Sequence, residues 1–419
     1  MNKYLWMLLA ALLLTSCEIE PPLHLHNEDE QDIDLPQIDL NLEVYWSYMA
    51  DYELQADYDW QSYWFYGWDD EDRRIFGELG YVEPTVFNLR RYFTGQEKGG
   101  AHSTAPLANQ FEGTSFSGTY QNGYYDILAW NNVTTLDGVQ SLHIDESAPY
   151  EEVIAYTNPS MYTSRYNAPR FQNAFYQPEP LFAAYDTGIY IPKDNWEEYG
   201  FVWVPERNRW VLTLHALLEP CTYIYLTQVI LHHNNGRITG VDGNGNLSGM
   251  ARSVCLNTGI AGSDAITVNY NNRFKQHCSK YGEDVDIAGG RLMTFGMCNL
   301  NPNRIATETS RSSDTETRQG MQYFSNVQEL LKHIDEVDPA RHYLDVNFQF
   351  NNGLDSTFVF DVTDQVRKYY RGGIITVELD VDEVQLPQRK TGSGFDAVVV
   401  DPEEEEYEFD MTRRKTKKK

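Results

Sequence analysis

Residues of the types used in catalysis occur along this sequence, but their spacing does not form a known catalytic arrangement. The sequence has no G-x-S-x-G, no H-E-x-x-H, no P-loop and no G-x-G-x-x-G after a strand. Asp242 to Asn246 resembles the start of a calcium loop, but the sequence lacks the glutamate that an EF-hand needs at the twelfth position. Acidic pairs such as Asp69-Asp70 arise by chance among 62 acidic residues. We therefore expect no enzyme, no cofactor and no metal site.

Thiols are the other reactive groups, and the sequence has five cysteines. Four of them lie in the C-terminal half, namely Cys221, Cys255, Cys278 and Cys298. Four cysteines allow three pairings, and sequence alone does not choose between them. No two of them have the close spacing of zinc ligands, which argues against a zinc site. The alternatives are at least one disulfide or four buried free thiols.

Cys17 stands apart because of what precedes it. Lys3 is followed by an apolar run from Tyr4 to Leu14, which is shorter than the about 20 residues that cross a membrane. The run ends in Leu14-Thr15-Ser16-Cys17, which resembles the bacterial lipoprotein signal, in which the cysteine is acylated and the chain is cut just before it. We therefore predict a signal peptide at 1–16 and a palmitate-type lipid on Cys17. The alternative is an ordinary signal peptide with a chance cysteine.

The residues after Cys17 predict a tether, and the overall charge excludes some partners. Residues 17–36 contain the acidic cluster Glu28-Asp29-Glu30 and too few apolar side chains to order themselves. The whole chain carries a formal charge of −29. Such a charge argues against nucleic acid, because nucleic acid requires basic patches. A predicted lipid and an acidic tether together indicate a chain held at the outer membrane, on the cell surface.

A cluster of aromatic residues follows the first predicted strand. Its spacing of about one helical turn is interrupted by Gly67 and by flanking acidic residues. We interpret it as an irregular loop or short helix whose rings pack on a sheet. The alternative is an exposed platform that stacks on host or dietary glycans, formed by Trp60, Tyr63, Trp64, Tyr66 and Trp68.

Short β-strands must position these residues. Residues 38–46 (IDLNLEVYW) alternate apolar and polar side chains, as a half-buried strand does, and similar runs recur to residue 384. Gln121-Asn122-Gly123 predicts the turn of a hairpin. Two helices are predicted, at 325–338 and 361–373. The pattern predicts a mainly β fold with a few short helices, an N-terminal domain at 37–204, a C-terminal domain at 205–388, and a weakly ordered tail at 389–419.

Several short motifs carry a resemblance to a known group. They are FSGTYQNGYYDILAWNN (116–132), LLEPCTYIYLTQVIL (217–231), LSGMARSVCLNTG (247–259), DVTDQVRKYYRGGIITVELDV (361–381) and the ending GSGFDAVVVDPEEEE. Together with the tetrapeptide that ends at Cys17, these motifs resemble the fimbrillin-type lipoproteins of Bacteroidales, in particular the fimbrial anchor and minor-subunit branch (type V pilus-like).

That resemblance implies two tandem transthyretin-like antiparallel β-sandwich domains and a role in cell adhesion. It implies fimbrial subunits as partners, joined by strand exchange in which a neighbour's strand completes an open sheet edge. In polymerising members a protease removes the first strand at a basic site. The early dibasic pairs here, Arg73-Arg74 and Arg90-Arg91, do not lie in an obvious linker. The resemblance therefore favours a retained lipid anchor, and a surface glycan-binding lipoprotein is the alternative.

Overall fold

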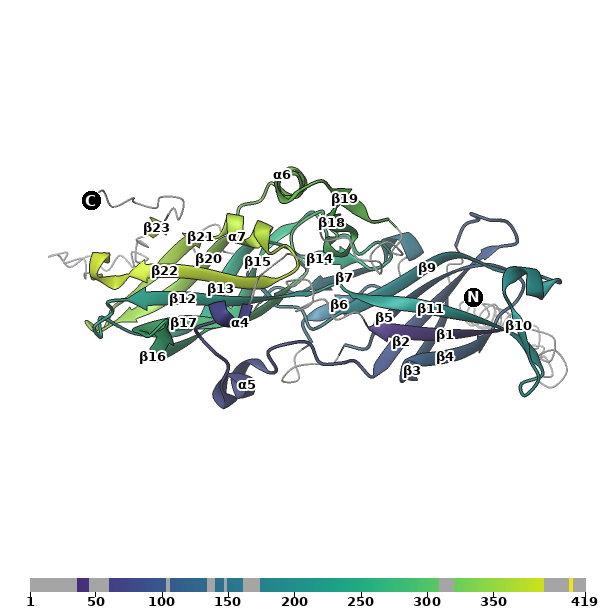
Figure 1. Ribbon diagram of the computed structural model, residues 1–419, viewed down its shortest axis with the longest axis horizontal. Coiled ribbons are helices and arrows are strands. Elements are labelled where there is room, and N and C mark those ends of the chain that lie inside the picture. Colours follow the sequence, from purple (N-terminus) through teal and green to yellow (C-terminus); the bar gives the residue numbers. More distant parts are fainter. Residues whose placement is uncertain are drawn as a thin grey trace, which may run out of the picture.

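The protein is a mainly β chain in which several sheets follow one another along the long axis of the molecule (Figure 1). The computed structural model describes residues 36–44, 60–102, 106–133, 140–146, 149–160, 174–308, 320–387 and 407–409. The predicted signal peptide, Cys17 and most of the predicted tether and tail lie outside these residues. Within them, no helix has the length and apolar character needed to cross a membrane.

One end of the molecule is an eight-stranded sheet, which we call the first lobe. Its strand order is β3-β2-β5-β9-β11-β1-β4, and β10 pairs with β11. The sheet folds around a core that includes Ile38, Leu40, Phe87 and Ile127. The strands are β1 (Gln37–Val44), β2 (Val86–Gly95), β3 (Leu107–Glu112), β4 (Ser115–Thr119), β5 (Gly123–Asn131), β9 (Phe182–Ile191), β10 (Val202–Val204) and β11 (Arg209–Pro220).

Strand β1 lies inside this sheet. It pairs in parallel with β11 from Gln37↔Val211 to Val44↔Leu218, and antiparallel with β4 on its other side. Its inward side chains Ile38 and Leu40 are buried, as the alternation in the sequence predicts.

The other end of the molecule, the second lobe, consists of a four-stranded and a six-stranded sheet that contribute to one core. The first has the order β16-β17-β12-β22, and the second β23-β21-β20-β13-β15-β8. The strands are β8 (Ala174–Tyr176), β12 (Tyr223–His232), β13 (Ile238–Ala251), β15 (Ala265–Asn271), β16 (Arg273–Lys280), β17 (Glu283–Thr294), β20 (Tyr343–Phe350), β21 (Asp355–Asp361), β22 (Gly373–Asp380) and β23 (Tyr407–Phe409).

Smaller elements join and cover the lobes. A three-stranded sheet, β6 (Leu142–Ile144), β7 (Ile154–Thr157) and β14 (Ser253–Cys255), packs in a core that contains Trp130 of the first lobe and Phe295 of the second. A two-stranded sheet pairs β18 (Ile305–Thr307) with β19 (Gln322–Phe324). The short α-helices are α4 (Trp60–Tyr63), α5 (Asp70–Phe76), α6 (Val327–Val337) and α7 (Thr363–Lys368). The 3₁₀ turns are η1 (Tyr150–Glu152), η3 (Trp196–Tyr199), η4 (Pro302–Arg304) and η7 (Val381–Glu383).

The mainly β prediction with few short helices is confirmed. Most strand pairs are antiparallel, but β1–β11, β12–β22, β15–β8, β18–β19 and β21–β23 are parallel. The two-domain division at 37–204 and 205–388 stays a prediction; in the structure, Arg209–Pro220 pairs with β1 of the first lobe. Strand pairing passes to the second lobe at β12, directly after Pro220-Cys221-Thr222.

Candidate functional site at the junction of the lobes

The segment of residues 60–85, which we call the strap, connects the two lobes. It follows β1 of the first lobe, lies with α4 and α5 against the four-stranded sheet of the second, and returns to β2 of the first (Figure 1). Gln228 is a polar side chain in the apolar strand β12, and it fixes the strap there. Its Oε1 accepts hydrogen bonds from the N–H groups of Phe65 (3.0 Å) and Tyr66 (3.3 Å), and its Nε2 donates to the carbonyl of Tyr63 (2.7 Å).

The predicted aromatic cluster lies in this strap and packs mostly against the sheet. Trp64 and Tyr66 are buried on the outer face of β12 and β17, and Trp68 is partly buried beside them. Tyr63 is exposed, and the side chain of Trp60 lies outside the described residues. The ring of Tyr66 lies over Gly289, where a Cβ atom would stand 2.9 Å from Tyr66 Cδ2. Trp64 and Tyr66 therefore pack on a sheet in the structure, while glycan binding by this cluster stays a prediction.

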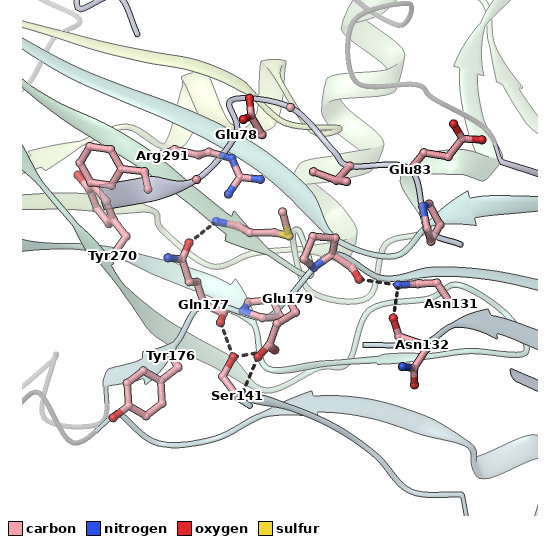
Figure 2. Close-up of a pocket in the computed structure, with 18 of the residues that line it drawn as sticks. Glu78, Glu83, Asn131, Asn132, Ser141, Tyr176, Gln177, Glu179, Tyr270 and Arg291 are labelled. Carbon is pink, nitrogen blue, oxygen red and sulfur yellow. Dashed lines mark hydrogen bonds between the residues drawn. The ribbon is translucent and has the colours of Figure 1, made fainter. Parts of the chain in front are cut away.

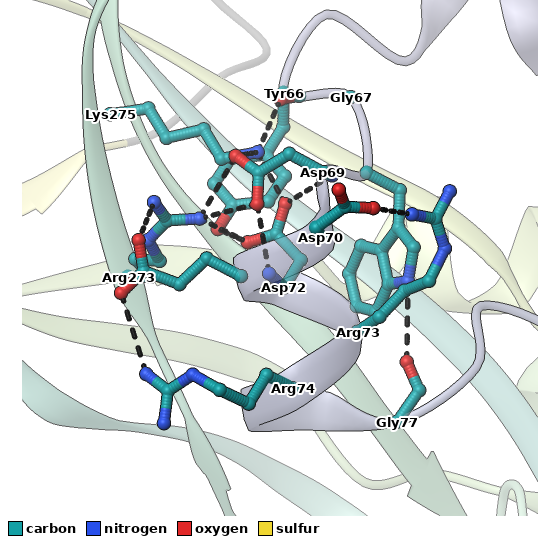
Figure 3. Close-up of polar contacts among 12 residues, drawn as sticks. Tyr66, Gly67, Asp69, Asp70, Asp72, Arg73, Arg74, Gly77, Arg273 and Lys275 are labelled. Atoms are coloured by element: carbon teal, nitrogen blue, oxygen red, sulfur yellow. Dashed lines mark hydrogen bonds and ion pairs between the residues drawn. The ribbon is translucent and has the colours of Figure 1, made fainter.

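An ion-pair cluster fastens α5 of the strap to β16 (Figure 3). Asp69 caps the helix by accepting from the N–H of Asp72 (2.9 Å), and Asp72 in return accepts from the N–H of Asp69 (2.9 Å). The carboxylate of Asp72 is fully buried, with Arg273 Nη1 at 2.7 Å from its Oδ1 and Lys275 paired to its Oδ2. Tyr66 donates its hydroxyl to Asp72 Oδ1 at 2.8 Å. A buried carboxylate is tolerated here because several donors surround it.

The electrostatics of the cluster follow from these contacts. Burial, and then the neighbouring charge of Asp72, raises the pKa of Tyr66 far above its usual range, so the hydroxyl stays a donor. For Asp69 some desolvation opposes ionisation, but the N–H of Asp72 together with Lys275 and Arg273 holds its pKa well below the usual range. Lys275 Nζ also lies 3.9 Å from the centre of the Tyr66 ring, a cation–π contact.

A cavity of about 920 Å³ lies where the strap passes between the lobes (Figure 2). Its walls come from the strap and the start of β2, the end of β5, the loop that carries Gln177 to Pro180, and strands β15 and β17 of the second lobe. Tyr176 and Tyr270 supply aromatic surface. The lining in the described residues contains no histidine, cysteine or lysine.

Polar side chains around the cavity are engaged in holding its walls together. Buried Glu179 accepts from Ser141 N (2.8 Å), Ser141 Oγ (2.8 Å) and Leu142 N (2.7 Å). Gln177 Oε1 accepts from Met293 N at 3.1 Å, and Arg291 Nε donates to the carbonyl of Leu79 at 3.0 Å. These bonds join the loop between β8 and β9 to the start of β6 and to β17, and they join β17 to the strap. These polar contacts therefore hold the connecting segments between the lobes against the second lobe.

The four C-terminal cysteines are free thiols, so the disulfide considered from the sequence is not present in this structure. Cys221 and Cys298 are buried in the core between the lobes. Burial raises the pKa of Cys298 to about 12 and that of Cys221 further. Cys278 lies partly buried on β16, and Cys255 ends β14. Thiols with raised pKa values are poor nucleophiles, which suits a packing role.

One group of residues could reach a cation. His233, Asp380 and Asp382 have donor atoms within 4.8 Å of one another at the outer end of β12 and β22. His233 and Asp382 are exposed, and Arg237 pairs with Asp382 at 3.7 Å. Three such donors fall short of the four ligands of a structural zinc site. His232 is the last residue of β12, and His233 follows it directly.

The edges of the sheets are the remaining candidate surfaces. Strand β21 would be an edge of the six-stranded sheet, but β23 from the C-terminal tail pairs with it in parallel from Phe358↔Tyr407 to Phe360↔Phe409. A bare edge presents unpaired backbone groups that recruit further strands. The tail therefore occupies a place where an extended segment can add to the sheet.

Comparisons with known proteins give similar folds only. No family model matches the chain, and no curated protein matches it. A candidate adhesin from Bacteroides ovatus is 14% identical with a TM-score of 0.45, covering 84% of this chain and 94% of its own. The fimbrial anchor protein Mfa2 from Porphyromonas gingivalis is 10% identical with a TM-score of 0.34, covering 82% and 90%. A candidate polysaccharide-binding protein from Bacteroides thetaiotaomicron is 9% identical with a TM-score of 0.36, covering 82% and 91%.

Proposed function

We propose that this chain is a surface lipoprotein that serves as an anchor or minor subunit of a fimbria. In this proposal the lipid on Cys17 holds it in the outer membrane, and two transthyretin-like β-sandwich domains join it to fimbrial subunits by β-strand complementation. The proposal combines the signal and motifs of the sequence with the position of β1.

The observation that carries the proposal is that β1, the first described strand after Cys17, is a fully integrated member of a sheet. It is paired on both sides, and Ile38 and Leu40 are buried. A chain acylated at Cys17 would therefore be joined to the folded lobe through an interior strand. This arrangement supports an anchor, since the lipid and the sheet belong to one uninterrupted chain.

The positions of the dibasic pairs support retention of β1. Arg73 and Arg74 lie in helix α5, where they pair with Asp70 and Glu71. Arg90 and Arg91 lie within β2, and buried Arg91 donates to the carbonyl of Thr119 (3.1 Å). Proteases cut exposed, extended segments, so neither pair is a ready cleavage site. A subunit that keeps its first strand keeps its predicted lipid.

The tail strand supports strand complementation. Strand β23 pairs with three of the seven residues of β21. Main-chain hydrogen bonds of this kind can form with a strand of the same chain or of a neighbour, because they read the backbone and not a specific side chain. In our proposal, exchange of a strand at this edge joins the chain to the next subunit.

The anchor role is tested by replacing Cys17 in a strain that displays fibres. Labelled fatty acid should enter the wild type and not Cys17→Ala, and fibres should pass from the cells into the medium in the variant. Label in both proteins, or fibres that stay on cells without the acylated cysteine, would overturn the anchor role.

The joining role is tested by removing the tail. Deletion of residues 389–419 should abolish co-purification with fimbrial subunits, because it removes β23. The matched control deletes 413–419, which takes the basic end and leaves Tyr407–Phe409. Equal co-purification of fimbrial subunits with the two variants would show that the edge of β21, where β23 pairs, does not bind the next subunit.

A further inference from the structure

An apolar patch of unusual exposure lies at the end of the first lobe, away from the second lobe (Figure 1). It consists of Tyr199, Val202 and Trp203, whose exposed fractions are 49%, 64% and 43%. We call these three residues the end patch. Val202 and Trp203 follow one another in β10, so their side chains leave opposite faces of the strand, and both faces are exposed at this end of the lobe. Exposed aromatic and aliphatic side chains gathered at one end of a molecule mark a surface that contacts something apolar.

The end patch rests on a fixed framework. Strand β10 carries Val202 and Trp203 and pairs with β11, where Trp203 lies opposite Trp210. The rings of Trp203 and Trp210 are 5.7 Å apart, and Trp196 packs against Trp210 at the same distance. Trp196 donates its Nε1–H to the carbonyl of Pro192 at 2.8 Å. The patch is therefore presented by packed aromatic rings on a paired strand.

The start of β1 lies beside this patch. Gln37 pairs with Val211 on one side of β11, and Val202 pairs with the same Val211 on the other side. Two strand spacings amount to about 10 Å, so Gln37 and the end patch occupy the same end of the sheet. Cys17 precedes Gln37 by a stretch that can span at most about 70 Å. The chain that leads to Cys17 therefore enters the fold at the end of the molecule that carries the patch.

The charges around the patch nearly balance, in contrast to the acidic chain as a whole. Between residues 193 and 209 the sequence has three basic residues and four acidic ones, namely Lys193, Arg207 and Arg209, and Asp194, Glu197, Glu198 and Glu206. Arg207 also pairs with Asp39 of β1 at 2.7 Å. A nearly neutral surface experiences little repulsion from phospholipid headgroups, so the apolar side chains decide what this end contacts.

We propose that the end patch is a membrane contact, in which Trp203 and Tyr199 lie at the level of the lipid headgroups and Val202 reaches toward the acyl chains. This inference rests on the lipid anchor proposed above. Tryptophan and tyrosine favour that level of a bilayer because their rings are apolar and carry one polar group. The contact sets the first lobe on the membrane with the second lobe pointing away from it.

The test places the chain on vesicles without depending on acylation. A hexahistidine tag in place of Cys17 holds the mature chain on phosphatidylcholine vesicles that contain a nickel-chelating lipid. Brominated phosphatidylcholine then quenches tryptophans that reach the bilayer. The wild type should be quenched, and most of this quenching should be lost in Trp203→Phe, since this is the tryptophan that we place at the interface. Trp68→Phe is the matched control and should leave the quenched fraction unchanged, because Trp68 lies in the strap where it packs against the second lobe.

Two results would overturn the membrane contact. One is equal quenching in the wild type and Trp203→Phe. The other is an absence of quenching by the brominated lipid, together with a change in Trp203 fluorescence when soluble polysaccharide is added. That second result would indicate a glycan site in the nearby hollow of about 420 Å³ at Trp196 and Trp210. Since the tag replaces the lipid, either result is distinct from failure of Cys17 acylation in cells, which would remove the anchor proposal.

Discussion

Replacing Asp72 with asparagine should loosen the strap from the second lobe. The carboxylate has no exposed surface, and it is the shared partner of Arg273, Lys275 and the hydroxyl of Tyr66. Asparagine keeps the shape but removes the charge, which leaves two cations with only the carboxylates of Asp69 and Glu71 beside them. Breaking a buried ion pair by removing one partner costs about 3 to 5 kcal/mol.

The expected loss is at the lower end of that range, about 3 kcal/mol, because Arg273 and Lys275 keep some contact with water and retain other acidic partners. Because the strap is a local element, the loss should appear first as local opening. Hydrogen exchange at the N–H groups of Phe65 and Tyr66, which bond to Gln228, reports this opening directly. Urea unfolding followed by tryptophan fluorescence gives the global change.

Asp70 offers a matched control in the same helix. Its side chain is 100% exposed and pairs only with Arg73 among the contacts described, so Asp70→Asn should change stability by less than about 0.5 kcal/mol. Figure 3 shows the two carboxylates on different sides of the helix start, with Asp72 turned toward β16 and Asp70 toward Arg73. Two results would refute the view that the buried cluster fastens the strap. One is an equal loss of stability in Asp72→Asn and Asp70→Asn. The other is hydrogen exchange at Phe65 that is no faster in either variant than in the wild type.

Three further outcomes follow from the same contacts. The pKa of Asp69 in the folded protein lies below its ordinary value of 3.8, so the contribution of this carboxylate to stability should be complete above pH 3.8 and should fade as the pH falls further. The substitution Asp69→Asn should therefore flatten the acidic part of a profile of stability against pH. An unchanged slope would count against a stabilising role of the ion-pair cluster. Gln228→Ala should cost about 2 kcal/mol in urea unfolding, because it leaves buried backbone groups of the strap without partners; a change within error would contradict this. Cys221 and Cys298 should react with a thiol reagent only after denaturation, and mass spectrometry of the folded chain showing either one labelled within minutes would disprove the packing role.

Elements with a strong local pattern were predictable from the sequence. Helix α6 falls inside the predicted 325–338, with Leu330 and Ile334 buried on its apolar face and Asn326 as its N-cap. Helix α7 is shorter than the predicted 361–373 and begins after Val362 without a side-chain cap. The spacing of apolar residues located α6, and start and stop signals located α7, whereas the exact ends of both helices depend on local contacts.

Long-range pairing was not predictable in the same way. The turn at Gln121-Asn122-Gly123 predicts a hairpin, and this prediction is wrong: β4 pairs with β1, while β5 pairs with β2 and β9. A turn signal fixes where a chain reverses, but the partner of each strand depends on the whole core. The cavity illustrates the same limit, since its walls come from residues as distant as Phe76 and Met293. A sequence signal for the attachment of the strap was Gln228, a lone amide side chain in the apolar strand β12.

Strand β1 also determines how the molecule responds to mechanical pull. It runs along the long axis, parallel to β11, with the end nearest Cys17 at the outer end of the first lobe (Figure 1). A force applied at Gln37 along that axis loads the backbone hydrogen bonds of eight paired residues in shear, because those bonds lie across the strand direction. Bonds loaded in shear share the force and fail together, whereas bonds at a peeled edge fail one at a time. The parallel pairing of β1 thus makes the connection toward Cys17 a clamp that resists tension.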